Sequence, residues 1–176
     1  AVLKGMNLLA GNIAGEDKLH EMASLQGSDC PFFLHDTPML ARGRGEVLTA
    51  TDLDLSGYYL VLVCPDIAIS TAEAYRAIQP DSNRKPLDVL LRRPIETWRE
   101  TVTNDFEEHL FRKHPLLFRI KSTLYESGAI YAAMSGSGSA LYGIFESEND
   151  LEQISGVPVA WKGMLQFPSG SMSKIT

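Results

Sequence analysis

The sequence predicts an α+β protein, and three features of the chain support this. Residues 58–64, Tyr-Tyr-Leu-Val-Leu-Val-Cys, form a run of aromatic and β-branched residues that is typical of a buried strand. Residues 115–128 place apolar side chains three and four positions apart and finish at a glycine, as amphipathic helices do. Two further strand-like runs, 129–134 and 140–145, flank a loop of small residues. Strands interleaved with helices indicate a mixed α and β architecture.

Size and composition set limits on the class of protein. The chain has 176 residues, 44% of them apolar and 22% charged, which suits one generous domain or two small ones. A formal net charge of -6 argues against general binding of nucleic acid or of anionic membranes, because both need a basic field. Two cysteines are too few for a disulfide framework, and no apolar run approaches the roughly 20 residues that span a bilayer. We therefore expect a cytoplasmic protein.

The first 25 residues predict two helices. Residues 1–10 begin without Met and in the middle of an apolar pattern, like a helix whose N-terminal cap is missing. We expect the sequence to be the later part of a longer protein. Residues 16–25 repeat apolar side chains near helical spacing, with acids early in the segment, and predict a second helix.

Residues 27–33, Gly-Ser-Asp-Cys-Pro-Phe-Phe, hold one acid between a glycine and a proline. Glycine permits a sharp turn, and Pro31 biases Cys30 away from helical geometry, so Asp29 is expected on a short connection with a fixed direction. A fixed direction is what a catalytic carboxylate needs. The alternative is that Asp29 only caps a turn, which is a common role of aspartate.

Residues 38–49 predict a hairpin, in which two glycines separate Arg42, Arg44 and Glu46. The arginines could meet phosphate or could be solvated strand residues. A polar junction over residues 52–57 then predicts a domain boundary near residue 55.

The remaining elements alternate in type up to the C-terminus. Ser70 or Thr71 is expected to cap a helix that runs to about Ile78, and the basic Arg119 and Lys121 of the helix at 115–128 are expected to face water. The other expected elements are a polar loop at 79–86, short helices at 87–91, 95–98 and 148–154, a helix after 104–107, a final strand at 157–164 and a loosely held tail at 168–176.

The loop Ser135-Gly136-Ser137-Gly138-Ser139 is a candidate anion-binding site, because small residues let a ligand approach the backbone amides. It lacks the Gly-Lys-Ser/Thr of a phosphate-binding loop, and Leu141 stands where a dinucleotide motif has its third glycine. A serine-hydrolase elbow is disfavoured, because the elbow should precede a helix and residues 140–145 predict a strand.

The four histidines predict no metal site. His20, His35, His109 and His114 show no ligand spacing, and each is interpreted as an ordinary imidazole.

Six segments, taken together and in this order, carry a resemblance to a known family. They are GSDCPFF at 27–33, ARGRGE at 41–46, PDIAISTAEAY at 65–75, NDFE at 104–107, HPLLFRIKSTLYESGA at 114–129 and AMSGSGSALYGIF at 133–145. The chain resembles the 4-diphosphocytidyl-2-C-methyl-D-erythritol kinases, a family of the GHMP kinase superfamily, over roughly residues 1 to 145.

The resemblance implies a GHMP-kinase two-domain fold with an active site in the cleft. Residues 1–55 would be the remainder of the N-terminal ATP-binding domain, and residues 56–176 the C-terminal substrate-binding domain. The family's glycine-rich ATP loop and its lysine lie upstream of the position that matches Ala1. Most of the ATP-binding domain is therefore expected to be absent, and this chain alone is expected to be inactive.

Residue by residue, the resemblance implies that Asp29 is the catalytic carboxylate. It implies that Thr71 and Tyr75 bind the substrate, with the Tyr75 ring stacked on cytosine. The third glycine-rich motif of the family falls on Ser135, Gly136, Ser137, Gly138 and Ser139, which would line the cleft near the phosphates.

The implied reaction is transfer of the ATP γ-phosphoryl group, with Mg²⁺, to the 2-hydroxyl of 4-diphosphocytidyl-2-C-methyl-D-erythritol, a step of non-mevalonate isoprenoid biosynthesis. The expected partner is this small molecule, without nucleic acid or membrane. Two alternatives stay open: a GHMP-like fragment that binds a ligand without turnover, and another GHMP kinase of the homoserine or mevalonate type.

Overall fold

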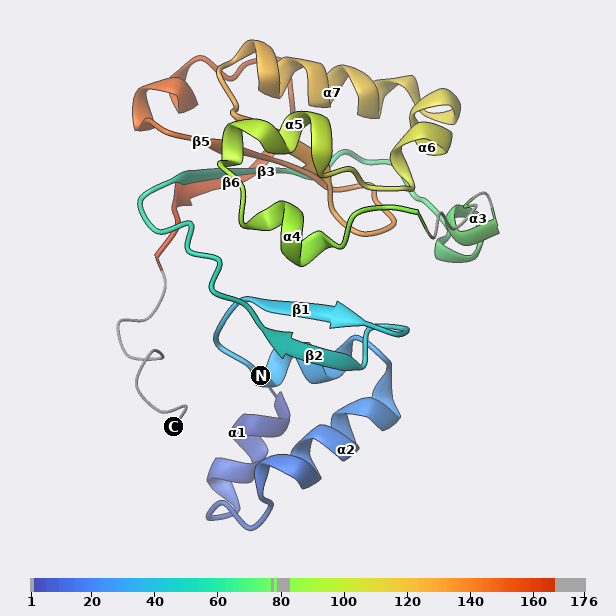
Figure 1. The fold of residues 1–176 in the computed structure, drawn as a ribbon, viewed down its shortest axis with the longest axis vertical. Coiled ribbons are helices and arrows are strands. Elements are labelled where there is room, and N and C mark those ends of the chain that lie inside the picture. The colour runs from blue at the N-terminus through green and yellow to red at the C-terminus, as the bar shows by residue number, and fades with distance from the viewer. Residues whose placement is uncertain (1, 77, 79–82, 167–176) are drawn as a thin grey trace. The chain divides into compact units, whose positions relative to one another are not determined.

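The computed structural model describes residues 2–76, 78 and 83–166, and these form two compact units (Figure 1). Unit 1 comprises the described residues 2–54, and unit 2 comprises residues 55–166. The assignment of residues 1–55 to an ATP-binding domain and of residues 56–176 to a substrate-binding domain stays a prediction.

Unit 1 begins with the two expected helices, α1 (Val2–Leu9) and α2 (Glu16–Gln26). The acids Glu16 and Asp17 occupy the first turn of α2, where they interact favourably with the helix dipole. The side chain of Asn7 ties the connection between the helices, because its amide donates to the carbonyl of Ala14 and its oxygen accepts from the N–H of Ala14, both at 2.9 Å.

The segment after α2 turns in a way that the sequence predicts only in part. Gly27 has φ of 166°, an extended conformation that any residue adopts, so the expected sharp turn is not made by this glycine. Ser28 and Asp29 make the turn, which the N–H of Cys30 closes by donating to the Gly27 carbonyl at 3.1 Å. The 3-10 helix η1 (Cys30–Leu34) follows, with Pro31 in its first turn. The predicted hairpin is confirmed: β1 (Met39–Arg42) pairs antiparallel with β2 (Val47–Ala50).

Unit 2 contains a sheet of four strands in the order β4-β5-β3-β6, and each neighbouring pair is antiparallel. The strands are β3 (Tyr59–Val63), β4 (Tyr131–Met134), β5 (Leu141–Phe145) and β6 (Val159–Met164). All four confirm strands that the sequence predicts. Antiparallel strands together with helices that cover them also confirm the α+β fold class.

The helices of unit 2 are short except for one. Figure 1 shows α7 running along one side of the sheet, next to α6. The helices are α3 (Thr71–Arg76), α4 (Leu87–Leu91), η2 (Ile95–Thr97), α5 (Trp98–Thr101), α6 (Glu107–Lys113), α7 (Pro115–Glu126) and η3 (Glu148–Glu152). The predicted helices at 95–98 and 148–154 thus form partly or wholly as 3-10 turns, the form that such short segments often take.

The core of unit 2 lies between α7 and the sheet. Leu117, Ile120 and Leu124 of α7 are fully buried against the strands, as the helical spacing of apolar residues predicts. Gly143 of β5 lets this helix come close, because a Cβ at that position would lie 3.3 Å from the Leu124 side chain.

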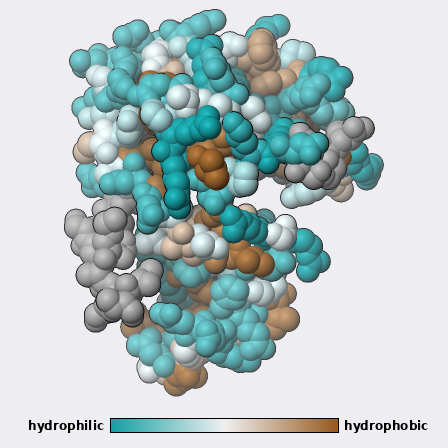
Figure 2. Space-filling model, viewed as in Figure 1, coloured by the Kyte–Doolittle hydropathy of each residue, from teal (hydrophilic) through white to brown (hydrophobic). Residues whose placement is uncertain are grey.

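Unit 1 buries much less. Among its described residues only Ala23 and Pro31 are buried, and Figure 2 shows hydrophobic residues at the surface of its helices. Leu9 and Ile13 are 90% and 82% exposed.

Two expectations fall outside the described residues. They concern part of the polar loop at 79–86 and the tail at 168–176. Within the ranges that the structure does describe, no helix has the length and apolar character needed to cross a membrane.

Candidate functional site

The loop of residues 135–139 connects β4 to β5 and is closed by its own backbone. The N–H of Ser135 donates to the carbonyl of Ala140 at 2.8 Å, and the N–H of Gly138 donates to the carbonyl of Ser135 at 3.0 Å. Gly136 and Gly138 have φ of 53° and 86°, the left-handed region that favours glycine. The two glycines are therefore needed for the shape of the loop.

Three amides of this loop are available to a ligand. The N–H groups of Gly136, Ser137 and Ser139 donate no hydrogen bond to any residue that the structure describes. Successive amides in a turn with left-handed residues form a concave site for anions. Anion binding by this loop stays a prediction.

The segment 104–107 holds the start of the loop, a role that the sequence does not reveal. The amide nitrogen of Asn104 donates to the carbonyl oxygens of Met134 and Gly136, each at 2.8 Å. The side chain of Glu107 accepts from the N–H of Met134 at 2.7 Å. Both residues belong to the NDFE motif, whose part in the resemblance is the only sequence signal that marks them.

Lys121 corrects one prediction from the sequence. It was expected to face water, but its side chain is only 21% exposed and its ammonium lies 2.6 Å from the Glu107 carboxylate. Glu107 itself is 8% exposed. A buried carboxylate is costly unless it is paired, so the lysine is drawn inward to meet it.

Thr71 and the loop are brought together. The Thr71 hydroxyl lies 3.5 Å from the Ser137 hydroxyl, although 66 residues separate them in the sequence. Ser139 contacts the segment between β3 and α3, because its hydroxyl donates to the carbonyl of Pro65 at 3.3 Å. The N-terminal turn of α3 is therefore placed beside the glycine-rich loop.

Tyr75 lies one turn further along α3, on the same face as Thr71. It is 65% exposed, and its ring meets the ring of Phe106 edge to face, with 5.1 Å between centroids. An ion pair between Glu73 and Lys113 ties α3 to α6. The hydrogen bond from Lys113 lowers the pKa of the Glu73 carboxyl, which keeps the pair ionised.

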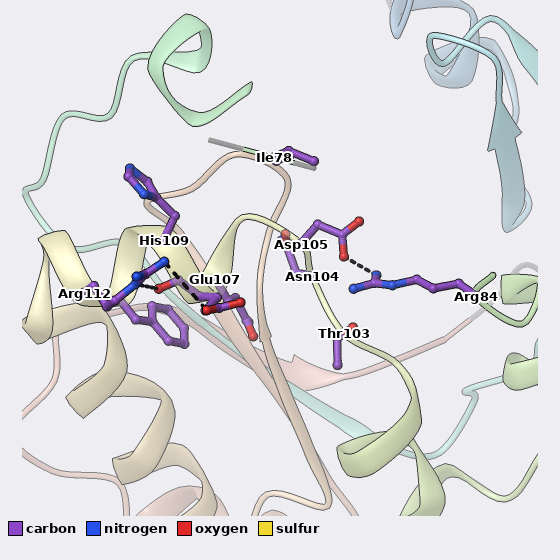
Figure 3. A pocket seen from close by; sticks show the side chains of 10 residues that line it. Ile78, Arg84, Thr103, Asn104, Asp105, Glu107, His109 and Arg112 are labelled. Carbon is purple, nitrogen blue, oxygen red and sulfur yellow. Dashed lines mark hydrogen bonds and ion pairs between the residues drawn. The ribbon is translucent and has the colours of Figure 1, made fainter. Parts of the chain in front are cut away.

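A pocket of about 640 Å³ adjoins the segment that holds the loop (Figure 3). Asn104 and Glu107 are among its lining residues, and so is Ile78. In Figure 3 the side chains of Arg84 and Asp105 point toward one another, and they form an ion pair. The pocket is polar and open, and its ion pairs neutralise most of its charge.

Asp29 belongs to unit 1, where it precedes η1 and is exposed. Its side chain makes no capping hydrogen bond, so the turn-capping alternative is not supported by the geometry. Gly45 of the β1–β2 turn, at φ of 115°, passes so close that a Cβ there would overlap the Asp29 carboxylate. The glycine of the ARGRGE motif therefore makes room for this acid.

A smaller pocket of about 340 Å³ lies within unit 1, and Asp29 is not among its lining residues. It is lined by His20, Ser24, Ser28, Arg44 and Glu46. Backbone N–H donors of Glu46 and Arg44 lower the pKa of the Glu46 carboxyl. The side chain of Glu46 thus stays bound to its own turn.

No metal-binding cluster is found in the described ranges, where no three histidine, cysteine, aspartate or glutamate residues are placed to hold an ion. The strand β5 directly follows the loop 135–139, so the helix that a serine-hydrolase elbow requires is not in that place.

Comparison with known proteins agrees with the fold and with the motifs. Residues 87–156 match the family described as GHMP kinases C terminal. This match lies within unit 2.

Over more of its length the chain resembles individual kinases of this superfamily. It is 46% identical over 154 residues to the 4-diphosphocytidyl-2-C-methyl-D-erythritol kinase of Parabacteroides distasonis, covering 88% of this chain and 57% of that protein. A crystal structure of 4-(cytidine 5'-diphospho)-2C-methyl-D-erythritol kinase superposes with a TM-score of 0.72 at 27% identity, covering 87% of this chain and 56% of that one.

A homoserine kinase from Cytophaga hutchinsonii shares the fold alone. It superposes with a TM-score of 0.50 at 15% identity, covering 85% of this chain and 54% of that one. The chain spans about half the length of the curated relatives that it matches.

Proposed function

We propose that this chain is the substrate-binding part of an ATP-dependent kinase that phosphorylates the 2-hydroxyl of 4-diphosphocytidyl-2-C-methyl-D-erythritol in non-mevalonate isoprenoid biosynthesis. The observation that carries the proposal is the arrangement in unit 2. A loop with three amides that meet no partner among the described residues lies beside a helix that presents an exposed tyrosine. The similarity to kinases of that name supports the choice of substrate.

In this proposal the N–H groups of Gly136, Ser137 and Ser139, which meet no partner among the described residues, donate to phosphate oxygens. Fixed backbone donors bind an anion without a basic surface, which reconciles a polyphosphate ligand with a net charge of -6. Thr71 contributes a hydroxyl at the edge of the loop, and Tyr75 offers its exposed ring to the cytosine.

Asp29 is proposed to accept or orient the proton of the attacking hydroxyl. Phosphoryl transfer needs little covalent help from the protein, so one well-placed carboxylate is sufficient for this role. Magnesium usually keeps several waters and binds through phosphates and one or two carboxylates. The described residues offer no cluster of ligands, so we propose that the ion enters with ATP and assign it no protein ligand.

The test is the Tyr75→Ala variant of the full-length protein that carries this chain. We expect the KM for the diphosphocytidyl substrate to rise at least tenfold and the KM for ATP to stay within twofold, because base stacking on an aromatic ring contributes about 1–3 kcal/mol. Phe118→Ala is the matched control, since Phe118 is another exposed aromatic residue of unit 2. ADP release coupled to a colour reaction measures both constants.

Two results would contradict the proposal. Equal effects on both KM values would remove the cytosine assignment, and no ADP from the wild-type full-length protein would exclude this kinase. Phosphorylation of homoserine or mevalonate instead would identify one of the other GHMP substrates. The prediction that the 176 residues alone turn over no ATP is checked by the same assay.

A further inference from the structure

We infer that Asn104 is a positioning residue, which turns the N–H of Ser137 in the glycine-rich loop toward a phosphate. The inference deepens the proposed function and depends on it only for the identity of the phosphate ligand. It rests on the hydrogen bonds that the Asn104 side chain makes to two carbonyls of the loop and on the amides that this arrangement leaves unpaired.

The direction of the Ser137 amide follows from peptide geometry. In a planar trans peptide the C=O of one residue and the N–H of the next point in opposite directions. The Gly136 carbonyl points at the Asn104 amide, 2.8 Å away. The Ser137 N–H therefore points away from Asn104, and it meets no partner among the described residues.

The second bond of Asn104 fixes the neighbouring peptide in the same way. The Met134 carbonyl also accepts from the Asn104 amide, so the Ser135 N–H points to the opposite side, where it closes the loop on Ala140. One side chain thus gathers two carbonyls on one side of the loop. The Ser137 N–H, on the opposite side of the loop, stays available as a donor to an anion.

The side chain of Asn104 is itself held in this orientation. Its oxygen accepts from the N–H of Phe106 at 2.9 Å, which leaves the NH₂ group to face the loop. A reversed amide would set its oxygen against two carbonyl oxygens. Glu107 also holds Met134, at the end of β4, because its carboxylate accepts from the Met134 N–H and is paired with Lys121.

Only a side-chain amide of this size suits the position. Aspartate has the same shape, but when ionised it has no donor and would repel both carbonyls. Asn104→Asp in the full-length protein is therefore the decisive variant. Asn149→Asp is the matched control, because it makes the same charge change at η3, where no side-chain bond of Asn149 to the loop exists.

We expect Asn104→Asp to raise the KM for ATP or to lower kcat at least tenfold. The KM for the diphosphocytidyl substrate should stay within twofold. Amide hydrogen exchange at residues 135–139 should become faster. Asn149→Asp should change none of these. Faster exchange with unchanged kinetics would show a purely structural role and overturn the inference, and so would unchanged exchange. If Asn104→Asp does not fold, Asn104→Ser keeps one neutral donor and should show the same pattern with a smaller change, two- to fivefold.

A binding measurement distinguishes a failure of the proposed function from a failure of the inference about Asn104. If the wild-type protein makes no ADP, titration with inorganic triphosphate, followed by the NMR shifts of residues 136–139, decides the inference alone. A Kd at least tenfold weaker in Asn104→Asp supports it. An equal Kd, or no binding to the wild type, overturns it.

Discussion

The two units differ in how they hold their residues in place. Unit 2 encloses nearly all of the fully buried apolar side chains, among them Phe145, Leu117 and Leu124. Unit 1 buries Ala23 and Pro31 among its described residues and leaves Leu9 and other apolar side chains exposed. Burial of apolar surface is the main favourable term in folding, so stability is concentrated in unit 2.

Unit 1 depends instead on local hydrogen bonds, such as the pair between Asn7 and Ala14 and the ladder between β1 and β2. Local bonds at the surface contribute little net free energy. The carboxylate proposed for chemistry therefore stands on a weakly packed part of the chain. The loop proposed to bind phosphate stands on a well-packed one. We expect amides of unit 1 to exchange with solvent faster than those of β3 and β5.

The largest expected effect is the loss of a core side chain of unit 2. Leu124→Ala should lower the free energy of unfolding by about 2–5 kcal/mol, because Leu124 is fully buried between α7 and the sheet and its removal leaves a cavity. Urea unfolding followed by tryptophan fluorescence measures this, since both tryptophans, Trp98 and Trp161, lie in unit 2.

Two leucines serve as controls for that variant. Leu116 lies on the same helix but is 50% exposed, and Leu25 of unit 1 is 79% exposed. Alanine at Leu25 should change stability by less than about 0.5 kcal/mol, and alanine at Leu116 by much less than at Leu124. A loss at Leu25 as large as that at Leu124, measured by hydrogen exchange in unit 1, would break the comparison between the units.

Most of the helices and strands could be predicted from the sequence, because their patterns are local. The β-branched run at 59–63 and the apolar spacing of 115–126 each specify an element without reference to the rest of the chain. The hairpin at 39–50 follows in the same way from its two turn glycines. The loop 135–139 stands out because its composition is unusual.

The supports of the site could not be predicted, because they depend on contacts between residues far apart in sequence. Asn104 meets the loop about 30 residues away, and Lys121 turns inward only because the Glu107 carboxylate is buried. Gly27 and Gly45 show the same limit. The sequence favours Gly27 as the special glycine beside Asp29, yet Gly45 is the one that the carboxylate requires.

The proposed chemistry depends on the close approach of Gly45 to the Asp29 carboxylate in unit 1. Gly45→Ala should cost about 1–3 kcal/mol of local stability, because alanine is strained at φ of 115° and its Cβ would overlap the Asp29 carboxylate. The displaced carboxylate should lower kcat of the full-length protein at least tenfold. Stability is measured by hydrogen exchange over residues 27–46, and kcat by ADP release.

Gly11→Ala is the matched control for this contact. Gly11 also lies in unit 1 with φ of 81°, but a Cβ there would meet nothing within 4 Å. It should show the strain without the loss of kcat. If both variants lowered kcat equally, backbone strain alone would explain the effect and Asp29 would not be implicated.

The smallest expected effect concerns pH and acts on unit 2 alone, because residues 1–54 contain no tyrosine. Burial raises the pKa of Tyr131, and burial also raises the pKa of Tyr142 beside it. Below about pH 10 a tyrosine is neutral in both the folded and the unfolded state, so these shifts change nothing. Above it the unfolded chain ionises first, and stability falls as the pH rises.

Tyr131→Phe should therefore reduce the loss of stability between pH 8 and pH 10.5 by about 1 kcal/mol, the linkage expected when one tyrosine stays neutral only in the folded state. At pH 8 the variant should be less stable by a similar amount, since it loses the hydrogen bond from the Tyr131 hydroxyl to the carbonyl of Val102. Urea unfolding at the two pH values measures the difference. An unchanged slope in Tyr131→Phe would show that the tyrosine ionises as readily in the folded unit as in the unfolded chain, and that the core of unit 2 is more open to water than its burial indicates.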